Sequence, residues 1–458
     1  MQIRILVAAL SVWALSSGCG GSEPSPPSGS PGPAPGAASG QPAQLSNDPF
    51  TDTTAQHQTA VEPSIFANGN TLVSAFQVGR IQSGASDAIG YATSTNGGGS
   101  WTKGILPSLT TAAGGPNLNV TDSVVTYDQA HGVWMIESLV FTSSASAVVV
   151  SRSTDGLSWN APVTVSSSAD YDKCWIACDN GATSPNRGTC YAEWDNVTNG
   201  QEILMSRSTD GGLTWSSPVG TADSATGLGG QIAIQPDGTV VVPFYNGNDS
   251  SPEILSFYST DAGMTWSSSA LIDATQPAPI PVRGETDPQI AVDSNGKIYV
   301  AWYDCRFESS CTSNDTVMVS STNGTSWSAV SLVASNTAGS GINHFLPTLA
   351  VNPSNPNNLA LMVYTSNTTQ CSGSSCAIQP VINTSTDGGE TWSPTTTLWP
   401  AFPVSSIANT TEGLMVGDYL SMAFIGNTVF PAFAAAVTPV PAGFSYNEQI
   451  FTTAINAE

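Results

Sequence analysis

Short apolar runs separated by turn residues recur along the chain from Glu62 onward. Each repeat contains a short strand, a turn at Gly, Asn or Pro, a strongly apolar second strand, a variable loop and a third strand. Short runs with such turn signals are typical of β-strands. Second strands are expected at residues 71–78, 133–136, 190–194, 239–245, 297–303, 359–364 and 428–433. The pattern predicts an all-β protein made of seven similar units.

A second pattern follows the third strand in six of these units. Its fullest form is S-x-D-x-G-x-T-W, as in residues 208–215, and two copies are one residue shorter. In such a turn the Asp side chain accepts backbone N–H bonds, Gly supplies a positive φ, and Trp packs beneath the turn. The six copies lie at residues 94–101, 153–159, 208–215, 259–266, 321–327 and 385–392.

This spacing resembles the Asp box, or BNR repeat, of sialidase-like β-propellers. The resemblance implies a ring of four-stranded antiparallel blades whose ligand site lies on the rim opposite the Asp boxes. Seven units favour seven blades, and a six-bladed ring, as in catalytic sialidases, is the alternative. The seventh unit ends with a third strand at residues 448–455, so we expect residues 50–60 to complete it and close the ring.

The N-terminus has the features of an export signal. Arg4 precedes an apolar run that is too short to span a membrane, and Ser16-Ser17-Gly18-Cys19 resembles a bacterial lipobox. Ser16 stands where the lipobox usually has Leu, so ordinary cleavage and secretion are the alternative. We expect a signal peptide at 1–18, a disordered Gly/Pro/Ser tether at 19–46 and the propeller at 47–458. The protein would then be exported and anchored at the cell envelope or outer surface through a lipid on Cys19.

The composition limits the possible partners. The chain has 10 Lys plus Arg against 34 Asp plus Glu, a formal net charge of −24. Such a surface repels nucleic acid and anionic membranes, which leaves the N-terminal lipid as the expected membrane contact. With 43 Gly and 31 Pro among 458 residues, the composition suits a turn-rich β protein. We expect a monomer.

The cysteines favour an oxidising compartment. Disulfides are expected for Cys305–Cys311 and Cys371–Cys376, which close short loops, and for Cys178–Cys190, which flank a turn. Cys174 is then left over. A metal cluster is disfavoured, because the chain has three His and none lies near a Cys pair.

The starts of the innermost strands carry polar residues that would face the channel mouth. Their side chains are acidic or hydrogen-bonding, which suits either a water-filled channel or a ligand or cation site. No cofactor is expected, apart from a Ca²⁺ ion that such a set could hold. These candidate ligand-binding residues are Glu62, Asp122, Lys173, Asp287, His344 and Asp418.

Three arginines, Arg80, Arg283 and Arg306, are expected on the same rim. A sialidase uses three arginines to hold the sialic acid carboxylate, and bidentate guanidinium pairs suit that task. The family pattern is incomplete, however. Val61-Glu62-Pro63 stands where sialidases have Arg-Ile-Pro, and no Lys or Arg follows Arg306.

Two residues match the catalytic positions that the resemblance implies. Asp87 lies in a loop resembling the one that carries the sialidase acid/base, and Tyr419 opens the last innermost strand as the nucleophilic Tyr does. A Tyr nucleophile needs a nearby carboxylate to accept its proton. Trp302 and Tyr303 near Arg306 could stack on sugar rings.

Three functional hypotheses follow. The first is a surface-tethered propeller that binds an extracellular glycan or protein without being a sialidase. The second is a sialidase-like exo-acting glycoside hydrolase with an altered active site. The third is an envelope scaffold that uses the ring for docking.

Overall fold

The computed structural model describes residues 41–167, 169–247, 251–333, 339–367 and 376–458. The export signal, Cys19 and nearly all of the predicted tether lie outside these residues. The regular secondary structure of the described chain is almost entirely β-strand, and none of its helices has the length and hydrophobicity needed to cross a bilayer. Its helical turns are η1 (Thr111–Ala113), η2 (Val197–Asn199) and η4 (Val404–Ser406).

The strands form successive antiparallel sets in chain order. The first set contains β2 (Gln56–Asn68), β3 (Thr71–Arg80), β4 (Ser86–Ser94) and β5 (Thr102–Ile105). The second contains β6 (Asn119–Asp128), β7 (Val133–Phe141), β8 (Ser146–Ser153) and β9 (Val163–Ser166). The third contains β10 (Tyr171–Cys178), β11 (Cys190–Asn196), β12 (Glu202–Ser208) and β13 (Val219–Gly220). The fourth contains β14 (Ala233–Ile234), β15 (Val240–Asn246), β16 (Glu253–Ser259) and β17 (Ala270–Ala274).

The later sets follow the same order. The fifth and sixth are β18 (Gln289–Val292), β19 (Ile298–Asp304), β20 (Asp315–Ser321), β21 (Ser331–Leu332), and β22 (Asn343–Val351), β23 (Leu359–Ser366), β24 (Ala377–Ser385), β25 (Thr396–Thr397) with β26 (Phe402–Pro403). The last contains β29 (Ser421–Ile425), β30 (Thr428–Ala436), β31 (Glu448–Thr452), β1 (Ala43–Gln44) and β32 (Ile455–Asn456), and a separate hairpin pairs β27 (Asn409–Thr410) with β28 (Gly413–Leu414).

The predicted second strands all form, because each can bury both of its faces between neighbouring sheets. Every residue of β19 is buried, for example. Val300 of β19 packs toward the preceding sheet with Val241, and Tyr299 packs toward the following sheet with Leu361. The hydrophobic core therefore consists of layers between successive sheets.

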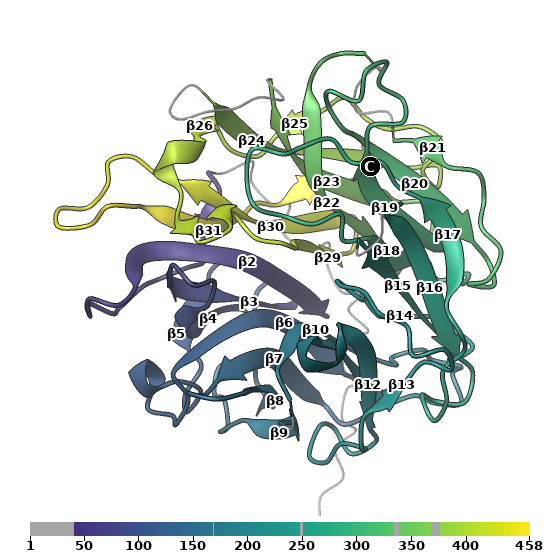
Figure 1. Ribbon diagram of the computed structural model, residues 1–458, viewed down its shortest axis with the longest axis horizontal. Helices are drawn as coiled ribbons and strands as arrows, with labels where there is room; N and C mark the ends of the chain where they lie inside the picture. Colours follow the sequence, from purple (N-terminus) through teal and green to yellow (C-terminus); the bar gives the residue numbers. More distant parts are fainter. Residues whose placement is uncertain (1–40, 168, 248–250, 334–338, 368–375) are drawn as a thin grey trace, which may run out of the picture. The chain divides into compact units, whose positions relative to one another are not determined.

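The innermost strand of each set contacts the innermost strands on both sides. In order, β2, β6, β10, β14, β18, β22 and β29 contact one another, and β29 contacts β2 again. Figure 1 shows these strands around one centre. This cyclic order is what a seven-bladed ring requires, and we keep seven blades as our prediction over six.

The strand that completes the last set differs from the one expected. β1 pairs antiparallel with β31 through Ala43↔Thr452 and Gln44↔Phe451, inside the predicted tether. Residues 56–60 instead begin β2 and reach β31 through the single pair Thr59↔Glu448. The closing segment thus comes earlier than residues 50–60, and Leu45, fully buried against the last set, holds it in place.

The Asp boxes form the predicted turns. In the box at 208–215, Asp210 Oδ1 accepts N–H bonds from Leu213 and Thr214, both at 3.0 Å. Gly212, at φ +78°, lies so close to Met135 of the preceding sheet that a Cβ would not fit. Gly98 of the first box lies equally close to Phe430 in the last set. Each of these boxes therefore joins its own sheet to the one before it.

Two of the predicted disulfides are present, Cys178–Cys190 between β10 and β11, and Cys305–Cys311 after β19. Cys371 lies outside the described residues, so its pairing with Cys376 stays a prediction. Cys174 is a buried free thiol, and its Sγ lies 3.1 Å from the carbonyl oxygen of Asp122.

Candidate functional site

Backbone bulges at the centre re-aim several side chains. The pairing of β2, β6, β10 and β22 with their neighbours shifts register within each strand, at two points in β2 and at one in each of the others. At these shifts Glu62, Asp122, Lys173 and Leu346 have φ of +54°, +50°, +41° and +49°. Positive φ is uncommon for residues other than glycine, and a bulge turns a side chain away from strict alternation. The same local device therefore recurs in four sheets.

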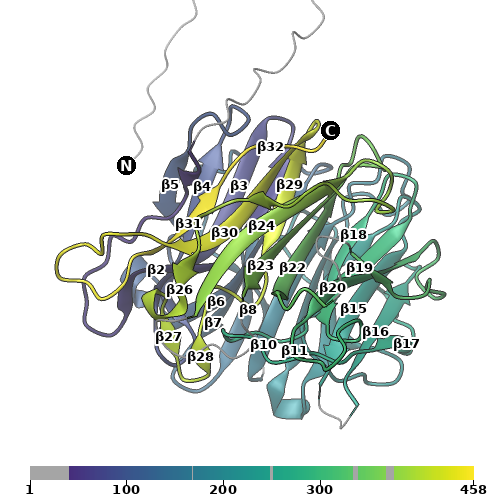
Figure 2. The ribbon, with the colours of Figure 1, turned by 90° about the horizontal axis from the view of Figure 1, so that it is seen from above.

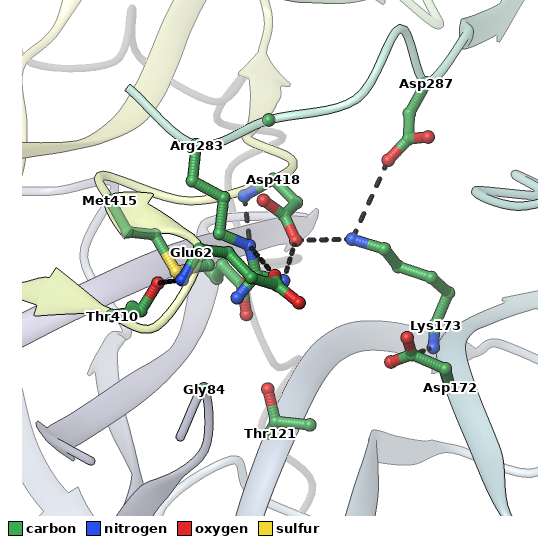
Figure 3. A network of polar contacts seen from close by, with 12 residues as sticks. Glu62, Gly84, Thr121, Asp172, Lys173, Arg283, Asp287, Thr410, Met415 and Asp418 are labelled. Carbon is green, nitrogen blue, oxygen red and sulfur yellow. Dashed lines mark hydrogen bonds and ion pairs between the residues drawn. The ribbon is translucent and has the colours of Figure 1, made fainter. Parts of the chain in front are cut away.

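Lys173 and Arg283 meet Asp418 at this centre (Figure 3). Lys173 Nζ lies 2.5 Å and Arg283 Nη2 lies 2.7 Å from Asp418 Oδ2. Asp287 Oδ2 lies 3.9 Å from the same ammonium group. The backbone N–H of Asp418 donates to Glu62 Oε1 at 3.3 Å. Five of the predicted ligand-binding residues thus form one network.

The two carboxyl groups near Lys173 differ in their protonation. Burial opposes ionisation of Asp418, but Lys173 and Arg283 hold its pKa at about 2. Burial raises the pKa of Asp287 to about 7, although Lys173 opposes this rise. The network therefore contains a permanent carboxylate and a carboxyl group that titrates near neutral pH.

Arg80 lies behind this network and is fully buried. Its Nη1 donates to Gln77 Oε1 and, at 2.5 Å, to the carbonyl oxygen of Gly84, and its Nη2 lies 2.9 Å from Met415 Sδ. Gln77 in turn donates to Glu62. Arg80 therefore supports the network through Gln77, and Met415 packs against the Arg80 guanidinium group.

A cavity of about 430 Å³ lies beside the network. Its charged lining residues are Asp122, Asp170, Asp172, Arg283 and Glu412, and Phe141 and Tyr171 add aromatic surface. Arg283 Nε is also paired with Glu412 at 3.3 Å. Carboxyl groups thus outnumber cations in the lining, and its arginine already has two carboxylate partners.

The cavity lies at the end of the sheets opposite the Asp boxes. Phe141, at its wall, pairs with Asn119 at the start of β6, whereas the Asp box after Ser153 begins beside Trp134 at the other end of β7. In Figure 2 the hairpin of β27 and β28, next to Glu412, lies along one edge, and β32 lies along the other. This is the rim on which the resemblance places a ligand site.

Asp122 is buried, whereas Asp170 and Glu412 of the same cavity lining are exposed. Burial raises its pKa well above the ordinary range, and the nearby Glu62 and Asp172 carboxylates add to that rise. The protonated form of Asp122 is therefore favoured relative to that of an ordinary aspartate. A buried, protonated carboxyl group at a cavity wall can donate a hydrogen bond or a proton to a ligand.

The two predicted catalytic residues lie apart from each other. The Tyr419 hydroxyl donates to the carbonyl oxygen of Ser123 at 3.3 Å, and burial raises its pKa well above the ordinary range. Its ring packs edge-on against Trp175, with centroids 5.6 Å apart. Asp87 lies on the face of the β3–β4 hairpin opposite Arg80, beside Asp52 and His57. The structure does not bring these two residues together.

Arg306 and His344 also lie outside the network. Arg306 pairs with Asp273 at 3.0 Å and Asp304 at 2.9 Å, so the three arginines do not converge. His344 Nδ1 lies 3.2 Å from the carbonyl oxygen of Asn314, and burial lowers its pKa. The expectation that Trp302 and Tyr303 stack on sugars was wrong, because both are buried in the core.

Sequence reasoning missed several buried carboxyl groups behind the network. Glu137 of β7 and Glu193 and Asp195 of β11 are fully or almost fully buried, and burial raises the pKa of each well above its ordinary range. Neither oxygen of Glu137 has a hydrogen-bond partner among the residues that the structure describes. The available signal was the acidic residue inside an apolar strand, as in V-W-M-I-E-S-L-V.

Two known family descriptions match the repeat pattern of this chain. The BNR repeat-like domain matches residues 142–370, half of the chain, and the BNR/Asp-box repeat matches residues 384–394. The chain belongs to the BNR repeat-like family. No curated protein matches this BNR repeat-like chain.

Solved structures with detectable similarity are distant from this BNR repeat-like chain. The Hadza microbial sialidase Hz136 is 17% identical with a TM-score of 0.45, and the alignment covers 88% of this chain and 66% of the sialidase. A PL25 ulvan lyase is 11% identical with a TM-score of 0.48 over 89% and 96% of the two chains. The GH93 α-L-arabinofuranosidase of Fusarium graminearum is 15% identical with a TM-score of 0.40 over 62% and 93%.

Proposed function

We propose that the protein binds a neutral, hydroxyl-rich glycan in the cavity opposite the Asp boxes. The supporting observation is the lining, in which Asp122, Asp170, Asp172 and Glu412 outnumber Arg283. Carboxyl groups accept hydrogen bonds from sugar hydroxyls, and a neutral sugar brings no charge into this acidic field.

An acidic glycan is disfavoured because the cations near the cavity are already paired or buried. Arg283 and Lys173 are both engaged by Asp418, and Arg80 is fully buried. A sialic acid carboxylate would have to displace a carboxylate that is already in place. Phe141 is half-buried at the cavity wall and offers an apolar surface for the C–H face of a sugar ring.

A glycan array, probed with protein purified without its first 40 residues, tests this proposal. We expect neutral glycans among the strongest signals, and Asp172→Asn should weaken the best ligand about 10-fold or more, since a charged hydrogen-bond partner contributes about 1.5–3 kcal/mol. The matched control is Asp237→Asn, on a turn at the other end of its sheet, which should leave affinity unchanged. Binding restricted to acidic glycans would refute the proposal.

The second candidate is glycoside hydrolysis, which the raised pKa of buried Asp122 favours, because a general acid needs a pKa above that of an ordinary carboxyl group. Chromogenic neutral glycosides and a sialoside separate the two candidates. Turnover that is lost in Asp122→Asn, with glycan binding retained, would favour the enzyme. Binding without turnover on the array's best ligands would favour the binding protein.

Export and anchoring through Cys19 remain part of the proposal. The lipobox-like sequence and the preceding apolar run support it. Cys19→Ser should move the protein from the membrane fraction to the soluble fraction, and a wild-type protein already found in the soluble fraction would contradict lipidation.

A further inference from the structure

A group of potential metal ligands lies away from the central cavity, where the segment between β1 and β2 meets β4. Asp52 and His57 come from that segment and from the start of β2, and Asp87 comes from β4. One donor atom from each of these three residues lies within 4.8 Å of the other two. The network around Asp418 does not use them.

The imidazole of His57 is held in one orientation by Asp48. Asp48 Oδ2 lies 3.2 Å from His57 Nδ1 and accepts the Gln58 N–H at 2.7 Å, while Oδ1 accepts the Phe50 N–H at 3.0 Å. This fixed carboxylate assigns the ring proton to Nδ1. A carboxylate on one ring nitrogen is the usual support for a histidine that binds a metal through the other.

The second ring nitrogen then faces oxygen atoms. His57 Nε2 lies 2.9 Å from the carbonyl oxygen of Asp52 and 3.6 Å from Asp52 Oδ2. In the neutral imidazole this nitrogen carries a lone pair, so it would face other lone pairs. Either a second ring proton or a cation between these atoms is required.

Asp87 gives independent evidence for a cation. Asp87 is 5% exposed, and within the described residues its Oδ2 has no hydrogen-bond donor apart from the facing Asp52 carboxyl group. Gly79 leaves the space that this oxygen occupies, since a Cβ there would lie 2.9 Å from it.

We propose that Asp52, His57 and Asp87 bind a divalent cation, with Zn²⁺ as the preferred ion. One imidazole nitrogen with carboxylate oxygens is a ligand set that Zn²⁺ accepts, whereas Ca²⁺ takes oxygen ligands. With Asp48, Asp52 and Asp87 ionised and His57 neutral, the group would carry three negative charges, which a dication would largely offset. The ion would tie the segment that follows the closing strand β1 to the first sheet.

Isothermal titration of tag-free, chelator-treated protein with ZnCl₂ and CaCl₂ tests the proposal. We expect one Zn²⁺ per chain and at least 10-fold weaker binding of Ca²⁺. Asp87→Asn and His57→Gln should abolish the Zn²⁺ signal, and Asp48→Asn should weaken it about 10- to 100-fold, as loss of an orienting carboxylate does elsewhere. The control is His131→Gln, whose histidine pairs with Asp128 on another hairpin and should leave binding unchanged.

Thermal unfolding gives a second measurement if a variant folds poorly. Zn²⁺ should raise the Tm of the wild type and of His131→Gln, but not that of Asp87→Asn. If the wild type does not bind stoichiometric Zn²⁺, the proposal is overturned, and the three side chains share a proton instead. Equal binding by Asp87→Asn, or a preference for Ca²⁺, would also overturn it.

Discussion

Replacing Lys173 by Met removes one charge from the central network and keeps a side chain of similar length. The side chain of Lys173 is 9% exposed, and those of its partners Asp418 and Asp287 are 2% and 5% exposed. The substitution therefore leaves buried carboxyl groups without their nearest cation. The apolar part of the side chain still fills its place, so the loss reports mainly on charge.

Removing one partner of a buried ion pair costs about 3–5 kcal/mol. Two features of the network reduce that cost. Arg283 remains 2.7 Å from Asp418, and Asp287 can take up a proton because its pKa is about 7. We therefore expect Lys173→Met to lower the free energy of unfolding by about 3 kcal/mol at pH 7.

Urea unfolding, followed by tryptophan fluorescence, measures this change as a shift in midpoint at constant slope. Lys297→Met is the matched control, because this lysine lies over the Tyr299 ring at 4.6 Å and outside the network. It should cost under about 1 kcal/mol. The double variant Lys173→Met/Asp418→Asn should show a coupling energy in the upper part of the usual 0.5–3 kcal/mol range. A loss below about 1 kcal/mol for Lys173→Met, or no coupling to Asp418, would refute a buried charge network.

Three other outcomes are expected. The pKa of Asp287 is raised to about 7, so the stability that its protonated form contributes is complete below about pH 4 and is lost as the pH rises through 7. The fall in Tm between pH 5 and pH 8 should therefore be smaller in Asp287→Asn than in the wild type. Asp210→Ala should lower the free energy of unfolding by about 1–2 kcal/mol through lost turn hydrogen bonds, with glycan affinity unchanged; reduced affinity in the folded variant would contradict the assignment of the two rims. A chain that begins at Asn47 should melt several degrees below one that begins at Gln41, since it lacks β1 and the buried Leu45, and equal melting would refute closure by β1.

Much of the fold could be predicted because its signals are local. The Asp boxes and the apolar second strands each carry their turn and burial pattern within about ten residues. The closing strand carries no such signal. Ala43 and Gln44 lie at the end of a Gly/Pro/Ser/Ala stretch, and their pairing with Phe451 and Thr452 depends on partners more than 400 residues away.

The candidate site was predictable only in part, for a related reason. Glu62, Lys173 and Asp418 meet because equivalent positions of a repeat fall at equivalent places around the ring. Which way a side chain points at those positions depends on bulges, which simple alternation cannot reveal. Asp87 was expected at the ligand site, but it lies on the opposite face of its hairpin from Arg80, where it meets Asp52 and His57.

The arginines also show why counting cations is a weak guide to ligand charge. Arg283 and Lys173 converge on one point, as an anion clamp would, but Asp418 already occupies that point. An external carboxylate would have to compete with one that the fold holds in place at high effective concentration. It would also leave Asp418 buried without a partner, at a cost of several kcal/mol. A neutral ligand pays neither cost, because it can bind to the carboxyl-lined cavity while these pairs remain intact.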